Sequence, residues 1–322
     1  MKSERGTGNR PLFLLTVSKK VLTVRTFLFY RLNLYGKGLT YINYGGTITY
    51  INYITYICYT INVKECDPMR IVAVANQKGG VGKTTTSQAL TAGLADKGYK
   101  VLGIDLDPQG NLSSACGSVN YNVPTIYELM KREVTAEETI QHMNGGYDII
   151  PSNIMLAGAE QELSQTGKEH RLKEAIAAVS DNYDYIIVDT PPSLGVLTVN
   201  AFTAASDILI PTTAGIFATT GINQLNETVK SVQKYCNPNV KITGILFTRF
   251  NPRANISKQI KELTEQLSQY ISAPIYKTYI RSAVAVEEAQ ANRVDIFDYA
   301  EKSTVSEDYK AFIEEFLKGE QE

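Results

Sequence analysis

The sequence predicts an α/β fold with a doubly wound, mostly parallel sheet and helices on both faces. Two observations predict it. From residue 69 onward, short β-branched runs alternate with segments of helical apolar spacing, the pattern of a parallel sheet covered on both sides. A glycine-rich loop also lies between the first such run and the first such helix, a position where open α/β sheets bind ligands. One domain covering residues 69–322 accounts for the whole pattern.

The expected elements follow one another in regular order. The strands are short apolar runs, expected at 71–75, 101–104, 147–150, 185–188, 208–211 and 242–248. The helices are expected at 84–97, 172–179, 255–270 and 304–318. The first helix should end at Gly98, because glycine adopts the left-handed conformation after a helix without strain.

Two of these helices carry an apolar face. Asn255 is expected to be the N-cap of the helix at 255–270. The apolar face of that helix comprises Ile256, Ile260, Leu263 and Leu267. The apolar face of the last helix comprises Val305, Tyr309, Phe312 and Phe316. Both helices should therefore pack one side against the sheet.

Residues 1–68 differ from the rest of the chain. Thr-Tyr-Ile-Asn-Tyr at 40–44 recurs at 49–53, and eight of the chain's 20 tyrosines lie in this stretch. Its composition is prone to β-aggregation, and it lacks the order of regions found in a signal peptide. Met69 directly precedes the first strand, so we interpret 1–68 as a non-native or disordered extension, with translation starting at Met69. A genuine but poorly ordered extension is the alternative.

Composition and charge exclude several classes of protein. Apart from residues 1–68, the chain carries 23 Lys/Arg and 30 Asp/Glu, so contact with nucleic acid would need a local basic patch. No apolar run reaches the roughly 18 residues of a membrane-spanning helix. The cysteines are scattered, which argues against a zinc site or disulfides and fits a reducing cytoplasm. They are Cys58, Cys66, Cys116 and Cys236.

The glycine-rich loop has the features of a phosphate-binding loop. It comprises Lys78, Gly79, Gly80, Val81, Gly82, Lys83, Thr84 and Thr85. Backbone N–H groups in such a loop point inward, and the helix N-terminus adds partial positive charge. Lys83 should neutralise the β- and γ-phosphates, and the Thr84 hydroxyl should ligate Mg²⁺. The sequence therefore predicts Mg-ATP binding by a P-loop nucleoside triphosphatase.

The loop departs from the ordinary pattern in one respect. Gln77 occupies the first glycine position, and Lys78 follows it. A second lysine at this position marks the deviant Walker-A type of loop. Since Lys83 already serves the loop's own phosphates, we expect Lys78 to reach the nucleotide of a partner subunit and to take part in catalysis.

Three aspartates follow expected strands at their carboxyl ends. Asp105 and Asp107 follow the second strand, and Asp189 follows the strand at 185–188. These strand ends share the ligand-binding edge of an open α/β sheet. Asp189 is expected to hold Mg²⁺ directly or through water, and Asp107 to orient the attacking water. Asp105 is expected to fix the loop and the metal shell.

These motifs resemble the ParA family of DNA-partitioning ATPases, and its short Soj-like branch most closely. The shared stretches are 76–86, 105–111, 183–194 and 290–303, and the resemblance covers 69–322. The resemblance implies a homodimer formed face to face around two ATP molecules, with Lys78 contacting the partner's nucleotide. It further implies non-specific DNA binding by the ATP-bound dimer, hydrolysis stimulated by a ParB-like protein, and a cytoplasmic, nucleoid-associated location.

The chain departs from this family at two places. Longer members carry an N-terminal helix-turn-helix domain, which residues 1–68 do not resemble. Arg253 matches a basic residue with which the family contacts DNA. The family segment I-P-R-N-V-R-L corresponds to residues 280–286, where its second arginine is lost beside Ala285. The resemblance therefore implies a DNA surface that includes Arg253 and is otherwise incomplete.

Two other functions share the same nucleotide loop. A MinD-like positioning ATPase needs a basic amphipathic C-terminal helix for anionic lipid, whereas residues 314–322 are acidic. An ATP-dependent ligase of cofactor biosynthesis is the alternative enzyme class. Stimulation of ATP hydrolysis by DNA and a ParB-like protein, rather than by a small carboxylic acid, would separate a partitioning ATPase from a ligase.

Overall fold

The computed structural model divides the chain into two units, Met1–Cys66 and Asp67–Glu322. The residues that it describes are 40–42, 48–50, 69–118, 123–162, 166–215 and 218–319. In the first unit, strand β1 (Thr40–Ile42) pairs antiparallel with strand β2 (Ile48–Tyr50). The expectation of a non-native or disordered extension otherwise concerns residues outside the described ones, and it stays a prediction.

The second unit contains an eight-stranded sheet in the order β10-β9-β8-β3-β7-β4-β6-β5. Its strands are β3 (Arg70–Val74), β4 (Val101–Asp105), β5 (Gln141–His142), β6 (Asp148–Ile150), β7 (Tyr185–Asp189), β8 (Asp207–Thr213), β9 (Lys241–Thr248) and β10 (Ile275–Tyr279). The strands pair in parallel except for β5 with β6. The six expected strands are confirmed within one or two residues at each end. The other two, β5 and β10, lie at the sheet edges and lack the buried apolar runs on which the prediction relied.

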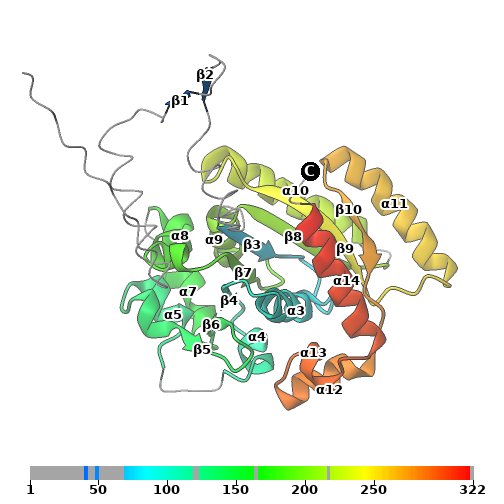
Figure 1. Ribbon diagram of the computed structural model, residues 1–322, viewed down its shortest axis with the longest axis horizontal. Helices are drawn as coiled ribbons and strands as arrows, with labels where there is room; N and C mark the ends of the chain where they lie inside the picture. Colours follow the sequence, from blue (N-terminus) through cyan, green and yellow to red (C-terminus); the bar gives the residue numbers. More distant parts are fainter. Residues whose placement is uncertain are drawn as a thin grey trace, which may run out of the picture. The chain divides into compact units, whose positions relative to one another are not determined.

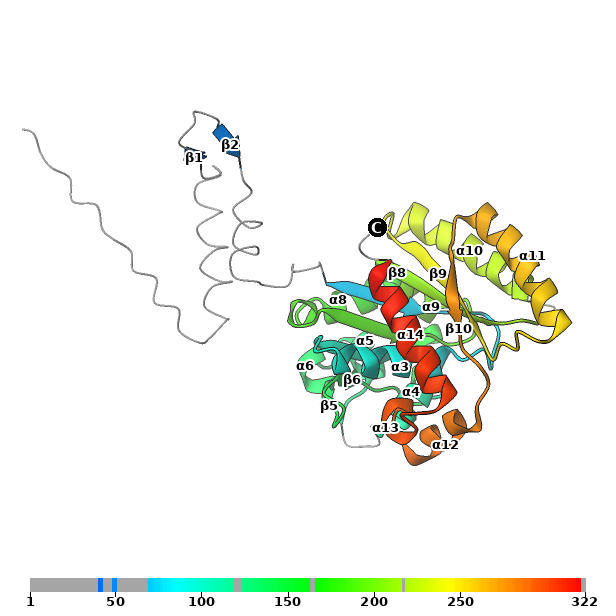
Figure 2. The ribbon, with the colours of Figure 1, turned by 45° about the vertical axis from the view of Figure 1, so that its right-hand side comes forward.

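Helices cover both faces of this sheet. They are α3 (Lys83–Asp96), α4 (Asn111–Ala115), α5 (Ile126–Lys131), α6 (Ala136–Thr139), α7 (Leu156–Glu162), α8 (Arg171–Ile176), α9 (Val196–Ala204), α10 (Ala218–Tyr235), α11 (Asn255–Ile271), α12 (Val284–Asn292), α13 (Ile296–Tyr299) and α14 (Thr304–Lys318). Short 3-10 helices occupy Lys168–His170 and Ser180–Asn182. Figures 1 and 2 show α3 and α14 on one side of the sheet and α9 and α10 on the other.

The hydrophobic core has two halves, one on each face. Ile71 and Ala73 of β3 pack in a cluster with α5, α7, α8, α9 and α10, whereas Val72 and Val74 pack in a cluster with α3, α13 and α14. Alternate residues of a strand point to opposite faces, so one buried strand serves both clusters. This arrangement confirms the predicted doubly wound α/β fold. Among the described residues, no helix is both long and apolar enough to cross a membrane.

The predicted helices are partly corrected. α3 ends as expected, with Gly98 in a left-handed conformation at φ 82°. The helix predicted at 172–179 is shorter, because α8 ends at Ile176 and a 3-10 turn follows. The apolar face of α14 is confirmed, since Val305, Tyr309, Phe312 and Phe316 are all buried.

The N-cap predicted for α11 is wrong. Asn255 is the first helical residue, and Ala254 occupies the N-cap position. The apolar face is half right: Ile260 is buried and Leu267 packs on the core, but Ile256 and Leu263 are each 49% exposed. α11 packs against α10, and the helical spacing of apolar residues does not tell how much of their face a neighbouring helix covers.

Candidate nucleotide-binding site

The glycine-rich loop connects β3 to α3, and two of its glycines have left-handed backbone conformations. Gly80 and Gly82 have φ values of 71° and 79°, which residues with a Cβ atom rarely adopt. A Cβ atom added at Gly79 or Gly80 would meet no heavy atom within 4 Å, so nothing in the described chain covers this part of the loop. Gly82 is the N-cap of α3 and has no side chain to bond the first helical N–H groups. The loop therefore fits a phosphate group.

Lys83 is the first residue of α3, and its side chain folds back over the loop. Its ammonium donates a hydrogen bond to the Lys78 carbonyl oxygen at 3.3 Å, and the residue is only 7% exposed. Burial lowers the pKa of Lys83, while the negative charges of Asp189 and Asp107 favour its protonated form. An anion bound at the loop would compensate the lost hydration of this ammonium.

Thr84 and Asp189 meet beneath the loop. The Thr84 hydroxyl donates to Asp189 Oδ2 at 2.7 Å, and the Ser87 hydroxyl donates to Asp189 Oδ1 at 2.9 Å. Asp189 is fully buried at the end of β7. Burial is the main cause that raises the pKa of Asp189 to about 7, and the charge of Asp105 acts in the same direction. A cation beside Thr84 would favour the ionised form of Asp189.

Asp105 lies beside Asp189 in the register of β4 and β7. Its Oδ2 accepts hydrogen bonds from the Ser113 backbone N–H at 2.8 Å and from the Ser113 hydroxyl at 2.7 Å. Its Oδ1 accepts from the Asp107 N–H at 3.1 Å. These bonds tie Asp105 to the loop between β4 and α4, and burial raises the pKa of Asp105 to about 6. The predicted part of Asp105 in the metal shell stays a prediction.

Asp107 and Lys78 occupy different surroundings. Asp107 lines the cleft above the loop, and its Oδ1 accepts a hydrogen bond from the Gln109 N–H at 3.0 Å. Lys78 is exposed, and its ammonium would lie 3.2 Å from a Cβ atom added at Gly215, on the loop after β8. The backbone N–H of Lys78 donates to Asn76 Oδ1 at 3.0 Å, which fixes the start of the loop.

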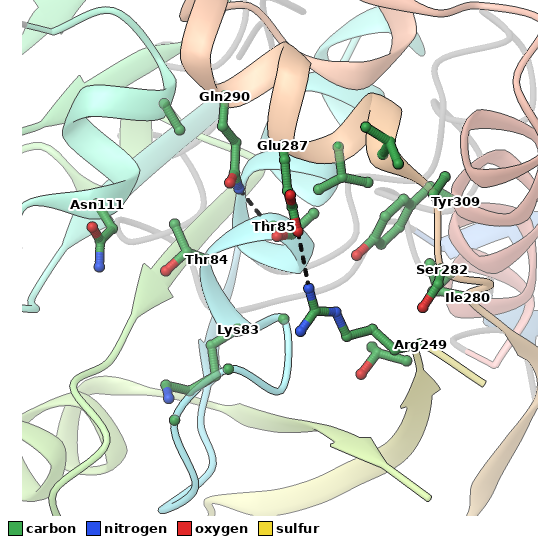
Figure 3. Close-up of a pocket in the computed structure, with 18 of the residues that line it drawn as sticks. Lys83, Thr84, Thr85, Asn111, Arg249, Ile280, Ser282, Glu287, Gln290 and Tyr309 are labelled. Atoms are coloured by element: carbon green, nitrogen blue, oxygen red, sulfur yellow. Dashed lines mark hydrogen bonds and ion pairs between the residues drawn. The ribbon is translucent and has the colours of Figure 1, made fainter. Parts of the chain in front are cut away.

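The cleft has a volume of about 930 Å³ and extends from the loop to α12 (Figure 3). Sequence reasoning missed one of its walls, which includes Thr248, Arg249, Glu287, Gln290 and Tyr309. The Thr248 hydroxyl, at the end of β9, donates a hydrogen bond to the Val81 carbonyl oxygen of the loop at 2.7 Å. No spacing in the sequence links these residues to the loop. One signal could have indicated these residues. Arg249 and residues 280–290 follow strands of the same sheet, and such strand ends share the ligand-binding edge.

Arg253 lies outside the cleft, in the exposed turn between β9 and α11. Its backbone N–H donates to Asn251 Oδ1 at 3.0 Å. Ala285 lies in α12 and packs against the second hydrophobic cluster. The role of Arg253 in DNA binding stays a prediction.

The fold and this site define a P-loop ATPase whose phosphate loop carries a second lysine. Residues 69–242 match the sequence model of the AAA domain family. The chain is 42% identical over 243 residues to the sporulation initiation inhibitor protein Soj of Bacillus subtilis, covering 74% of this chain and 95% of Soj. It is 38% identical over 252 residues to the chromosome partitioning protein ParA of Myxococcus xanthus, covering 77% of this chain and 88% of that protein. The chain belongs to the ParA/Soj family of partitioning ATPases.

Solved structures share this fold and contain bound nucleotide. Cobyrinic acid a,c-diamide synthase from Mycobacterium smegmatis, with bound ADP and magnesium, has a TM-score of 0.67 at 34% identity, over 78% of this chain and 94% of that chain. A putative plasmid partition protein from Borrelia burgdorferi, bound to AMPPNP, has a TM-score of 0.68 at 27% identity, over 78% and 99% of the two chains. Nucleotide, with magnesium in the first, is the ligand class that the sequence predicts here.

Proposed function

We propose that this protein binds Mg-ATP in the cleft between the phosphate loop and α12 and hydrolyses it to drive DNA partitioning. The exposed glycines and the free N-terminus of α3 support phosphate binding, and Lys83 supplies a buried positive charge. Thr84, with Asp189 behind it, would hold magnesium, which adds positive charge beside the β- and γ-phosphate oxygens. The membership of the ParA/Soj family supports partitioning as the purpose of hydrolysis.

The observation that carries the proposal is the contrast between the two lysines of the loop. Lys83 is buried and folds over its own loop, whereas Lys78 is exposed beside Gly215. An exposed loop lysine is available to a second chain that approaches the same face. In the proposed ATP-dependent homodimer, Lys78 contacts the nucleotide of the partner subunit, so neither active site is complete in a monomer.

Asp107 is the residue we assign to the attacking water. It lines the cleft, whereas Asp105 and Asp189 are fully buried and bonded to hydroxyl groups. A carboxylate on the cleft wall can accept a hydrogen bond from water and orient it for attack on the γ-phosphate. Lys83 and the partner's Lys78 stabilise the negative charge that develops on the phosphate oxygens.

The ATP-bound dimer is proposed to bind DNA without sequence preference, and a ParB-like protein is proposed to stimulate hydrolysis. The exposed Arg253 supports a phosphate contact, since an exposed arginine on a turn can contact a DNA phosphate without reading bases. Such a protein acts in the cytoplasm, on the nucleoid. The MinD-like alternative is disfavoured because α14 buries Phe312 and Phe316 and has no apolar face left for lipid.

The ligase alternative is kept because the cobyrinic acid a,c-diamide synthase structure is 34% identical. ATP hydrolysis by the full chain separates the two functions. A partitioning ATPase should turn over faster with DNA and the ParB-like protein of the same genome, and should not respond to small carboxylic acids. Acceleration by a carboxylic acid substrate, with no response to DNA and the ParB-like protein, would instead establish a ligase.

A further inference from the structure

We propose that Arg249 and Glu287 form a clasp across the open side of the cleft, and that opening of this clasp limits nucleotide release. The inference rests on the proposed binding of Mg-ATP in the cleft. The two residues line the cleft and come from different elements, Arg249 directly after β9 and Glu287 in the first turn of α12. Arg249 Nη2 and Glu287 Oε1 are 3.3 Å apart, and Figure 3 marks this contact with a dashed line.

Arg249 has an unusual backbone conformation. Its φ is 49°, in the left-handed region that residues other than glycine rarely adopt. The other non-glycine residues with positive φ in the described chain, Arg132, Ser272 and Arg293, are helix C-caps, where this conformation is common. Arg249 follows a strand instead. Strained backbone conformations of this kind cluster at functional sites, and Arg249 lines the candidate nucleotide cleft.

The chain on both sides of Arg249 is held in place. The Thr248 hydroxyl donates a hydrogen bond to the Val81 carbonyl oxygen of the phosphate loop at 2.7 Å. The Phe250 N–H donates to the Ile280 carbonyl oxygen at 2.9 Å, which ties the other side to the segment leading into α12. The backbone of Arg249 is therefore held between the phosphate loop and the segment that leads into α12, whereas its side chain is more than half exposed.

α12 has a second tie to the phosphate loop. Gln290 Nε2 donates to Thr85 Oγ1 at 3.1 Å. Gln290 lies three residues after Glu287 in the same helix, so both side chains are on one face. That face looks onto the cleft, as both residues line it. One side of α12 is thus bonded to the start of α3, and the clasp joins the same helix to the end of β9.

The clasp is built to open easily. The side chains of Arg249 and Glu287 are 56% and 72% exposed, so water and salt screen their attraction. Such exposed pairs shift an equilibrium by roughly fivefold at most. A contact of this strength keeps the cleft closed most of the time and still breaks quickly. A nucleotide leaving the phosphate loop toward solvent would have to wait for that opening.

Stopped-flow release of a fluorescent ATP analogue from the full chain tests the clasp. Arg249→Ala and Glu287→Gln should each raise the dissociation rate about threefold to fivefold, and the double variant should raise it no further. The charge swap Arg249→Glu with Glu287→Arg should restore a slow rate. Salt should accelerate release from the wild type and leave the single variants almost unaffected.

Glu174→Gln is the matched control, since it breaks an exposed arginine–glutamate pair with Arg132 on α5 and α8, away from the cleft. Its release rate should equal that of the wild type. Tight binding with unchanged release in both clasp variants would overturn the clasp and leave the proposed function intact. A swap that fails to slow release would mean that Arg249 acts on the nucleotide alone, which also overturns the clasp. A wild type that binds no nucleotide would overturn the proposed function, and the clasp with it.

Discussion

The ammonium of Lys83 lies 3.3 Å from the carbonyl oxygen of Lys78, so one lysine of the loop is anchored on the backbone of the other. Their side chains nevertheless have separate surroundings, because Lys83 is buried and Lys78 is exposed. The two lysines are therefore in contact but have side chains in different surroundings. We expect them to have different roles and to respond differently to mutation.

The first prediction separates these roles. Lys83→Ala should abolish ATP binding, because it removes the buried positive charge of the loop. Lys78→Ala should still bind ATP but remain monomeric and inactive. Size-exclusion chromatography with ATP, combined with equilibrium ATP binding, measures both. Lys100→Ala, an exposed lysine before β4, is the control and should behave as the wild type. A Lys78→Ala protein that dimerises and hydrolyses ATP normally would refute the action of this lysine across the dimer.

The second prediction concerns Asp107. Asp107→Asn keeps the shape of the side chain and removes its charge, so ATP binding and dimerisation should persist. Loss of the residue that orients water should lower the single-turnover hydrolysis rate by a factor of about 10²–10⁴. The trapped dimer should stay on DNA in a pull-down with ATP. Hydrolysis at the wild-type rate would remove Asp107 from the reaction and direct attention to another cleft residue.

The third prediction concerns the pH dependence of stability. The pKa of Asp189 in the folded chain is about 7, above its ordinary value of 3.8, so folding favours the protonated form. Its contribution to stability is fully present below about pH 4 and is lost as the pH rises through about 7. Urea unfolding of the nucleotide-free chain between pH 4.5 and 7.5 should therefore show a steeper decline for the wild type than for Asp189→Asn. Parallel curves would show that Asp189 is ionised throughout this range.

The fourth prediction concerns DNA. Arg253→Ala should weaken DNA binding by the ATP-bound protein equally for all sequences, because a phosphate contact carries no sequence information. The slope of log affinity against log salt should fall by about one. Fluorescence anisotropy over a salt series measures it, with Arg132→Ala, an exposed arginine after α5, as the control. Unchanged affinity at every salt concentration, with ATP binding intact, would mean that Arg253 does not contact DNA.

The fifth prediction concerns the start of the folded domain. A chain that begins at Met69 should fold and hydrolyse ATP at least as fast as the full chain, because the described residues of both hydrophobic clusters all belong to 69–319. Met69 itself packs against the first cluster. Thermal melting and ATPase rate compare the two chains. A chain that begins at Ala75 lacks β3 and should not fold. An insoluble or inactive Met69 chain would show that residues 1–68 are needed.

The sequence by itself determined the sheet's buried strands and the floor of the site. Short apolar runs identified the six central strands. A strand that is buried on both faces is a continuous apolar run, without the alternation of polar and apolar residues seen in half-exposed strands. The loop at 78–85 could also be predicted from sequence. Its glycines permit backbone conformations that other residues rarely adopt, and its lysine and threonine stand at the spacing of a phosphate-binding loop. Asp105, Asp107 and Asp189 followed from the rule that parallel strands end at a shared edge.

Tertiary structure alone decided the rest. Whether Ile256 and Leu263 of α11 are buried depends on how much of that helix α10 covers, and helical spacing carries no such information. The far wall of the cleft is built from side chains remote in sequence: Gln290 bonds Thr85 across 205 positions. Contacts of that kind depend on strand order and on the packing of α12, which no local pattern encodes. The phosphate loop is a property of adjacent residues, whereas the wall that closes over it exists only after the chain has folded.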